Sequence, residues 1–228
     1  MGEPLTIKEF EAASQAVREV ARETDLLYSK VLSSQCHNDV YLKLENMQNT
    51  GSFKIRGAYY KLCSLTEEER AKGLIAASAG NHALGVAYAA QALGCKTKIF
   101  MPATTPFVKV DRTKAYGVEV ELYGNDFNET LEYAMKVAKE EDATFIEPFD
   151  DLTVATGHGT IAMEIIKELP LVDYIIVPIG GGGLAAGVAT LAKTINPHIK
   201  VIGVEPAGAN CVQRSLKRGE LVAMDVWY

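Results

Sequence analysis

The sequence predicts an α/β fold in which mostly parallel strands alternate with helices. From about residue 74 onward, short apolar runs alternate with longer runs of helical periodicity, which is the pattern of consecutive βαβ units. The 228 residues are 48% hydrophobic and 23% charged, a composition typical of a globular protein with a sizeable core. The apolar run that ends at residue 179 is followed by four glycines, which indicates a turn between a strand and a helix.

The individual elements follow from local patterns. Thr6 and Glu9 form a capping box, and Phe10 and Val17 continue at helical spacing, so the first helix begins at residue 7. Gly94 ends a later helix. Strands are expected at 39–45, 74–77, 98–101, 118–123, 144–146, 174–179 and 200–204, and further helices at 53–62, 83–93, 107–116, 128–141, 154–169, 184–195 and about 209–217.

The composition excludes several classes of protein. The net charge of −6 argues against a nucleic-acid partner, because phosphate contacts require a basic surface. The cysteines are far apart and form no C-x-x-C pair, so neither a disulfide scaffold nor a metal site is expected. The four cysteines are Cys36, Cys63, Cys95 and Cys211.

No targeting or membrane signal is visible in the sequence. Residues 1–4 lack the basic and apolar regions of a signal peptide, which predicts a cytoplasmic protein. Residues 174–192 carry no charge, but Pro178 and the glycines at 180–183 interrupt them. We therefore interpret this stretch as strand, loop and helix, and expect no membrane partner.

The glycine turn at residues 180–183 is the first candidate site. A helix N-terminus offers free N–H groups to a phosphate, and glycines let the phosphate approach the backbone closely. The pattern Gly181-x-Gly183-x-x-Ala186 also fits the dinucleotide fingerprint, and Glu205 stands where an acid would bind the ribose. This turn by itself leaves a nicotinamide enzyme open.

A second polar turn, residues 78–82 (SAGNH), also lies between a strand and a helix. Its small polar groups at a helix N-terminus favour an anion. A nucleophile elbow around Ser78 is not favoured, because Ala76 stands where that motif needs glycine. Taken alone, Asn81 could be only a helix cap and His82 only a packed core histidine.

Lys54 is the third candidate, because the start of a helix is not where the helix dipole favours a cation. A lysine that points into a cleft loses solvation, and its pKa falls. It then becomes a nucleophilic amine suited to a Schiff base. A lone surface lysine remains the other interpretation of this residue.

Three motifs together resemble one known family. The segments 52–58 (SFKIRGA), 78–82 (SAGNH) and 180–183 (GGGG) occur in this order and resemble those of the threonine/serine dehydratases. These enzymes belong to the tryptophan-synthase-β-like group that uses pyridoxal 5'-phosphate (PLP). The resemblance covers nearly all of the chain. It implies a two-lobed, three-layer parallel-sheet fold, a site between the lobes, and conversion of threonine or serine to a 2-oxo acid and ammonia.

The resemblance also implies a role for each motif. Lys54 would form the Schiff base with PLP and later move the Cα proton of the substrate, while Phe53 would lie against the pyridine ring. Asn81 would hydrogen-bond the phenolic oxygen of PLP. The implied substrate loop is Ser78, Ala79, Gly80, Asn81 and His82, and the implied phosphate loop is Gly180, Gly181, Gly182, Gly183 and Leu184.

Ala79 favours dehydration over racemisation, because related serine racemases commonly place a second serine there as a base, and alanine exchanges no proton. We expect residues 49–151 to form a small substrate lobe and residues 1–48 and 152–228 to form a large PLP lobe. The catalytic unit of the family is longer, and no Ser-Gly-Gly-Asn-like segment follows Glu205. A C-terminally truncated chain with an incomplete large lobe and open sheet edges is therefore expected.

Two other hypotheses stay open beside a dehydratase that forms a homo-oligomer. One is a truncated, catalytically impaired protein that binds PLP weakly or serves only as an interaction module. The other is a nicotinamide enzyme that uses the glycine turn. The variant Lys54→Ala would separate them, because it removes the Schiff base of a dehydratase and leaves nucleotide binding untouched.

Overall fold

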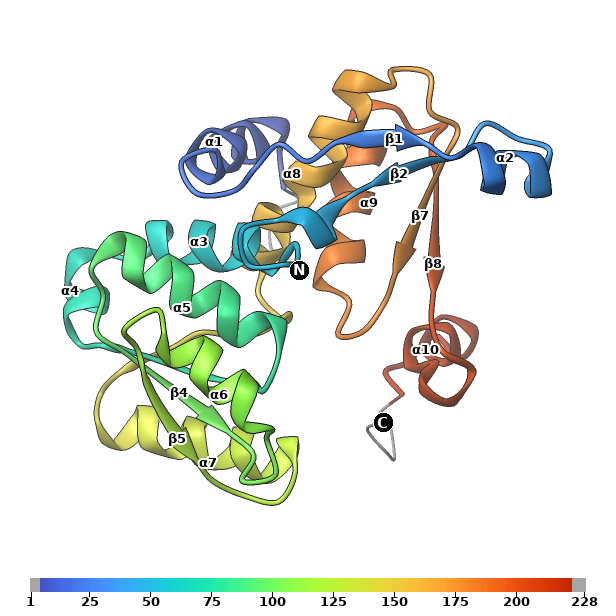
Figure 1. The fold of residues 1–228 in the computed structure, drawn as a ribbon. Helices are drawn as coiled ribbons and strands as arrows, with labels where there is room; N and C mark the ends of the chain where they lie inside the picture. Colours follow the sequence, from blue (N-terminus) through green and yellow to red (C-terminus); the bar gives the residue numbers. More distant parts are fainter. Residues whose placement is uncertain (1–4, 223–228) are drawn as a thin grey trace.

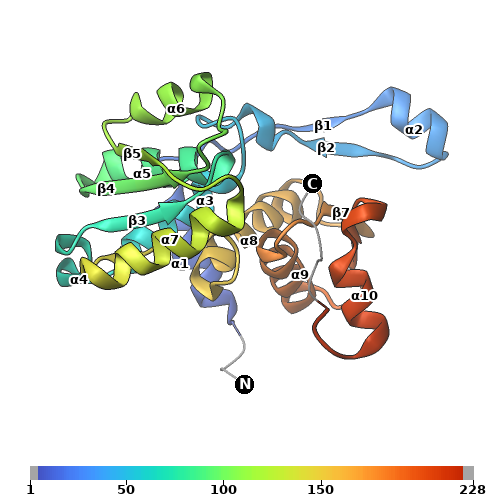
Figure 2. The same cartoon turned by 90° about the horizontal axis from the view of Figure 1, so that it is seen from below.

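A parallel sheet of four strands organises the first of two bodies in the chain. The structure is a computed structural model that describes residues 5–222. The strand order is β5-β4-β3-β6, and helices cover both faces (Figures 1 and 2). The strands are β3 (Leu74–Ala77), β4 (Thr97–Met101), β5 (Glu119–Leu122) and β6 (Thr144–Phe145). The helices are α3 (Lys54–Ser64), α4 (Glu67–Ala71), α5 (Asn81–Leu93), α6 (Phe107–Lys114) and α7 (Phe127–Glu140).

Alternate residues of the central strands face opposite sides of this sheet. Leu74 and Ile99 pack in a cluster with α3 and α5, whereas Ile75 and Phe100 pack in a cluster with α7. All four residues are buried. The first body is therefore a three-layer structure with two cores, as a parallel sheet covered on both faces requires.

The second body is a two-stranded parallel sheet that helices cover on one face only. Ile175 and Val177 face a core shared with Phe10 and Leu191. Its elements are α1 (Ile7–Val17), α8 (Leu152–Glu168), β7 (Tyr174–Pro178), α9 (Gly183–Ile195) and β8 (Lys200–Val204). The opposite face exposes apolar side chains, namely Tyr174, Ile176, Ile202 and Val204.

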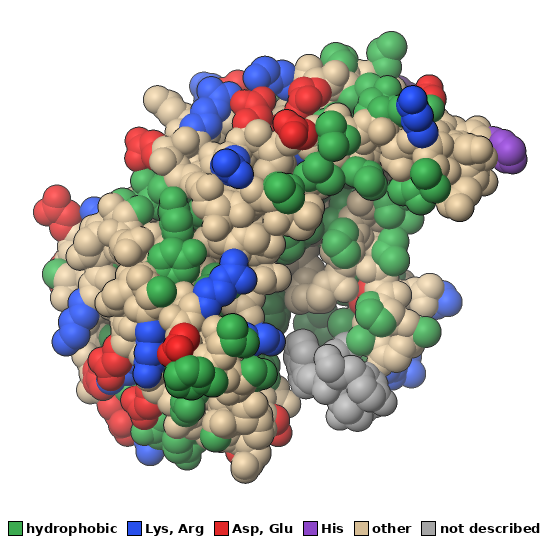
Figure 3. Space-filling model, viewed as in Figure 1, with side chains coloured by type: hydrophobic (Ala, Val, Ile, Leu, Met, Phe, Trp, Pro, Cys, Tyr) green, Lys and Arg blue, Asp and Glu red, His purple; other side chains and the backbone are tan. Residues whose placement is uncertain are grey.

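An antiparallel arm extends away from both bodies (Figures 1 and 2). It consists of β1 (Leu26–Tyr28), α2 (Lys30–Cys36) and β2 (Tyr41–Lys43). Hydrophobic side chains lie along this arm and over β7 and β8 (Figure 3). On the arm they are Leu27, Tyr28, Val31, Tyr41 and Leu42.

The predicted α/β fold with parallel strands is confirmed, and most expected elements agree with the observed ones to within two or three residues. The expected strand at 39–45 is the shorter β2, and β1, α2 and α4 were not expected. After β8 the chain forms a 3-10 turn (Ala207–Ala209) and α10 (Cys211–Arg218). The lobe limits at 48/49 and 151/152 stay a prediction.

Residues 1–4, which underlie the cytoplasmic prediction, lie outside the described residues, as do residues 223–228. Among residues 5–222, no helix is long and apolar enough to cross a membrane.

Candidate active site

Lys54 is the first residue of α3, and its amine is largely shielded from solvent. Its Nζ donates a hydrogen bond to the backbone carbonyl of Pro148 at 2.6 Å. Burial lowers the pKa of Lys54 to about 8. A lowered pKa favours the neutral form of the amine, which is the form that a nucleophile requires. Of the two interpretations of this lysine, the structure favours the desolvated amine.

Two glycines bring neighbouring helices close to the first turn of α3. A Cβ on Gly85 of α5 would lie 2.9 Å from the backbone carbonyl carbon of Lys54. A Cβ on Gly57 would lie 2.4 Å from the ring of His158 in α8 and 2.6 Å from the carbonyl oxygen of Val154. Since neither position has room for a methyl group, α5 and α8 enclose Lys54 from two sides.

Arg56 anchors the same turn through a buried ionic cluster. Its side chain is 1% exposed and pairs with Glu45 at 2.8 Å and with Glu164 of α8 at 2.6 Å. Lys43 of the arm pairs with Glu164 at 2.7 Å. Hydrogen bonds to both carboxylates raise the pKa of Arg56 against the opposing effect of burial. The start of α3 is therefore tied to α8 and to the base of the arm.

The segment after β6 connects the parts of the site. The carbonyl of Ile146 accepts a hydrogen bond from His82 Nε2 at 3.2 Å, and the carbonyl of Pro148 holds the lysine amine. The ring of Phe149 lies against the glycine turn, because a Cβ on Gly181 would be 2.1 Å from it. Within four residues, the chain thus contacts all three sequence motifs.

The glycine turn opens α9 with its backbone accessible. Gly182 has a φ of +93°, which favours glycine. A Cβ on Gly180 or Gly182 would meet nothing within 4 Å, whereas Gly183 is packed on the Phe149 backbone. The first N–H groups of a helix have no partner within it. The turn is closed on the Phe149 side and open on the other, as a phosphate requires.

The turn at 78–82 lies at the carboxyl end of β3. Ser78 Oγ accepts the N–H of Gly80 at 3.1 Å, so that amide is satisfied within the turn. Asn81 begins α5 and is exposed. His82 is buried, and desolvation together with the charge of Lys54 lowers its pKa to about 3. Its imidazole is neutral and packed in the core, and its Nε2–H is used in the hydrogen bond to Ile146, so it does not act as an acid at neutral pH.

The sequence does not predict two neighbours of Lys54. They are Pro148, which accepts the bond from its amine, and His158, whereas Phe149 contacts the glycine turn. A backbone carbonyl carries no residue-type signal, and His158 lies in a helix more than a hundred residues from the lysine. Only the position of residues 147–151 after a parallel strand could have indicated that they face the site.

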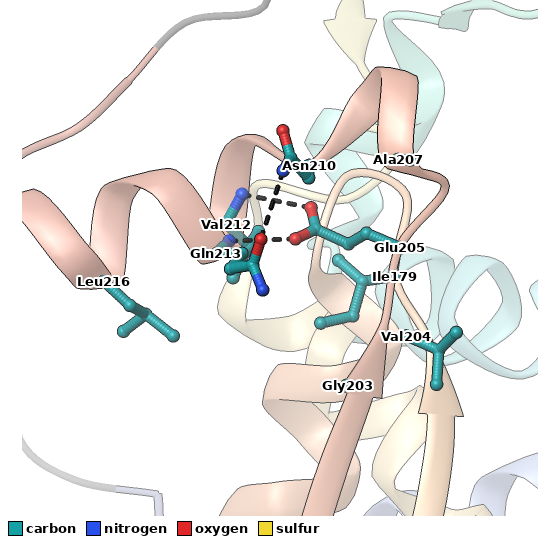
Figure 4. Close-up of a pocket in the computed structure, with 9 residues that line it drawn as sticks. All are labelled: Ile179, Gly203, Val204, Glu205, Ala207, Asn210, Val212, Gln213 and Leu216. Atoms are coloured by element: carbon teal, nitrogen blue, oxygen red, sulfur yellow. Dashed lines mark hydrogen bonds between the residues drawn. The ribbon is translucent and has the colours of Figure 1, made fainter.

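Glu205 does not serve as a free ribose-binding acid. Its carboxylate accepts the backbone N–H groups of Val212 at 3.0 Å and Gln213 at 2.9 Å. Figure 4 shows these bonds, with Ile179 and Leu216 among the residues that line the pocket beside them. The carboxylate caps α10 and is not free to bind a ribose, so the structure does not support a nicotinamide site. Within residues 5–222 no cluster of side chains could hold a metal ion.

Fold and site together define a class of protein. A largely buried lysine with a lowered pKa, together with an open glycine turn at a helix N-terminus, suits an α/β enzyme that carries a phosphorylated aldehyde cofactor. Residues 17–226 match the family described as pyridoxal-phosphate dependent enzyme. The chain belongs to this family.

Curated relatives and solved structures agree with this assignment. The chain is 46% identical over 215 residues to an L-threonine ammonia-lyase of Thermotoga maritima, and the match covers 94% of this chain and 54% of that protein. It is 42% identical to threonine deaminase isoform 2 of Solanum lycopersicum, with a TM-score of 0.91 over 99% of this chain and 63% of that one. Maize serine racemase is 31% identical, with a TM-score of 0.94 over 99% and 69%. The chain spans about half the length of the two curated L-threonine ammonia-lyases that it matches.

Proposed function

We propose that the protein acts in PLP-dependent deamination of L-threonine or L-serine, giving 2-oxobutanoate or pyruvate and ammonia. The desolvated amine of Lys54 carries this proposal, with its pKa lowered to about 8. A relative with 46% identity named L-threonine ammonia-lyase supports the reaction class. Threonine and serine differ by one methyl group, which a pocket discriminates by only ~1–3 kcal/mol.

The residues of this chain would divide the work. Lys54 would hold the cofactor covalently through its amine and, once released, take the proton from Cα of the substrate. The N–H groups at the start of α9, with the glycine turn, would bind the cofactor phosphate. The turn at 78–82 would hold the substrate carboxylate, and the exposed Asn81 would reach the cofactor's phenolic oxygen.

PLP, when bound, supplies the electron sink that makes the Cα proton removable. The pKa of Lys54, already lowered by burial, suits a group that gives and takes a proton near neutral pH. Ala79 offers no second base opposite the lysine. This supports deamination over racemisation, although serine racemases are among the structural neighbours.

The test is an absorption spectrum of the protein with added PLP, before and after borohydride reduction, followed by peptide mapping. We expect a yellow band that reduction fixes onto Lys54, and its loss in Lys54→Ala. Lys61, on the same helix and paired with Asp151 at 2.7 Å, provides the matched control Lys61→Ala. Formation of 2-oxo acid from threonine and from serine then tests the reaction. A band fixed on another lysine would contradict the assignment.

A second candidate is a protein that binds PLP but is catalytically impaired. The open apolar face of β7 and β8 favours it, because the glycine turn is attached to this less covered sheet. A fixed Lys54 band without 2-oxo acid would support this candidate. The homo-oligomer and the cytoplasmic location stay predictions.

A further inference from the structure

His158 makes two contacts that bracket Lys54 along the chain. Its Nδ1 lies 3.2 Å from the backbone nitrogen of Gly57, whose N–H it accepts. Its ring packs against Phe53, with 4.9 Å between the centroids and an angle of 80° between the planes. Phe53 precedes the lysine and Gly57 follows it by three residues, so one side chain of α8 contacts both ends of the first turn of α3.

The hydrogen bond determines which ring nitrogen carries the proton. Nδ1 accepts an N–H and is therefore unprotonated, so the neutral ring carries its proton on Nε2. His158 is 0% exposed, and burial, followed by the charge of Lys54, lowers its pKa well below the usual value. Nε2 has no hydrogen-bond partner in the described part of the chain. The contacts to Gly57 and Phe53 thus account for what this imidazole does in the structure.

Close packing makes this contact rigid. A Cβ on Gly57 would lie 2.4 Å from Cε1 of His158, and a Cβ on Gly157 would lie 2.7 Å from Cα of Gly57. The first turn of α3 cannot move toward α8 without a clash. The Lys54 backbone, in turn, is held from the other side by Gly85.

We propose that His158 is a positioning residue for Lys54, which fixes the first turn of α3 by accepting the Gly57 N–H and by packing on Phe53. The proposal rests on the proposed function in that it takes Lys54 as the reactive amine. His158 itself touches neither cofactor nor substrate in this proposal.

His158 affects Lys54 through packing and its hydrogen bond to Gly57, not through its charge. The titratable groups that act on this region are His82 from α5, His158 from α8, and Arg56 on the helix of the lysine. Both imidazoles are neutral, and Arg56 is paired with two carboxylates. Replacing His158 therefore removes no charge from the surroundings of Lys54. It frees the first turn and admits water to the amine, so the pKa of Lys54 rises.

The experiment measures Lys54 directly in cofactor-free protein. The lysines compete for a limiting amount of acetic anhydride at pH values from ~6 to ~11. Peptide mass spectrometry then gives the extent of acetylation of each lysine as a function of pH. His158→Leu removes the acceptor and the ring, whereas His158→Gln keeps an acceptor for the Gly57 N–H. We expect labelling of Lys54 at pH 7 to fall up to ~10-fold in His158→Leu, because a rise of one unit in its pKa lowers the neutral fraction by that factor. In His158→Gln we expect a smaller fall. Labelling of Lys61 is the internal reference.

Ile165→Ala is the matched control for a purely structural effect. Ile165 lies two turns further along α8 and packs in the core of the second body. Ile165→Ala should lower the urea midpoint of unfolding about as much as His158→Leu does, while the labelling curve of Lys54 stays unchanged. An unchanged Lys54 curve in folded His158→Leu would overturn the proposal, and so would an equal shift in Ile165→Ala. If His158→Leu does not fold, the comparison of His158→Gln with the native protein decides. Failure of the proposed function would show separately, as a missing Lys54 band with PLP.

Discussion

The two sheets of this molecule differ in how completely they are covered. All four residues of β3 are buried, and so are four of the five in β4. In β7 only Ile175 and Val177 are buried, whereas Ile176 is 68% exposed. Both sheets are parallel, and β3 and β7 are both apolar strands, so the difference lies in the helices around them. The first sheet has helices on both faces, and the second on one.

This difference matters because the candidate site takes parts from both bodies. Lys54 and the turn at 78–82 belong to the fully covered body, while the glycine turn follows β7 in the partly covered one. Regions with fewer buried contacts open at lower free energy. We therefore expect the amine of Lys54 to be held more firmly than the glycine turn.

The largest expected effect comes from truncating one isoleucine in each sheet. Ile99 of β4 is 0% exposed, and Ile99→Ala should lower the free energy of unfolding by ~3–4 kcal/mol. Ile176→Ala, on the open face of β7, should cost less than ~1 kcal/mol. Urea unfolding of the cofactor-free protein measures both. Comparable losses in the two variants would mean that the face of β7 is covered in solution.

A buried lysine makes the stability of the first body depend on pH. The pKa of Lys54 falls from 10.5 to about 8 on folding, because of burial. Between these values the unfolded state binds more protons than the folded state, so the free energy of unfolding rises with pH across this window. Below pH 8 both states are protonated, and the burial penalty is fully present.

The expected gain across the window is about 2–3 kcal/mol. It is measured as the difference between the native protein and Lys54→Met, which removes the contributions of other titrating groups. The free energy of unfolding of the native protein should increase relative to that of Lys54→Met as the pH rises from 8 to 10.5. A flat difference would show that solvent reaches the amine in the folded state, and the contrast between the two bodies would then disappear.

The placement of the candidate site's motifs on helices and turns could be predicted because each motif is local, whereas their roles stay predictions. Glycines before a helix, and a lysine at the start of one, are readable from neighbouring residues, and both lie where they were expected. The alternation of strands and helices likewise placed both βα turns. The dinucleotide alternative failed on Glu205, whose carboxylate caps α10. The sequence could not show this, because a cap and a ribose ligand require the same residue type.

The remaining parts depend on contacts between distant segments. His158 contacts Gly57 only because α8 packs across α3, and the Pro148 carbonyl reaches Lys54 across 94 positions. The apolar residues of the arm's short strands and helix follow neither the period of a strand nor that of a helix, so no pattern predicts β1 or α2. Tertiary packing, not local propensity, determines these features.

The smallest expected effect tests the turn of the less covered body. Gly182→Asp and Gly182→Asn place side chains of nearly equal size at the same φ of +93°, in space that is open in the structure. Both variants strain the backbone alike, so their difference isolates the added charge. The added carboxylate repels a phosphate bound a few ångströms away, so Gly182→Asp should bind PLP ~10-fold more weakly than Gly182→Asn. The difference should increase at low salt, where the repulsion is less screened. Spectroscopic titration with PLP, and with pyridoxal as the phosphate-free control, measures it. A gap that persists with pyridoxal would show that the turn does not bind the phosphate, and Lys54 would then need another partner for it.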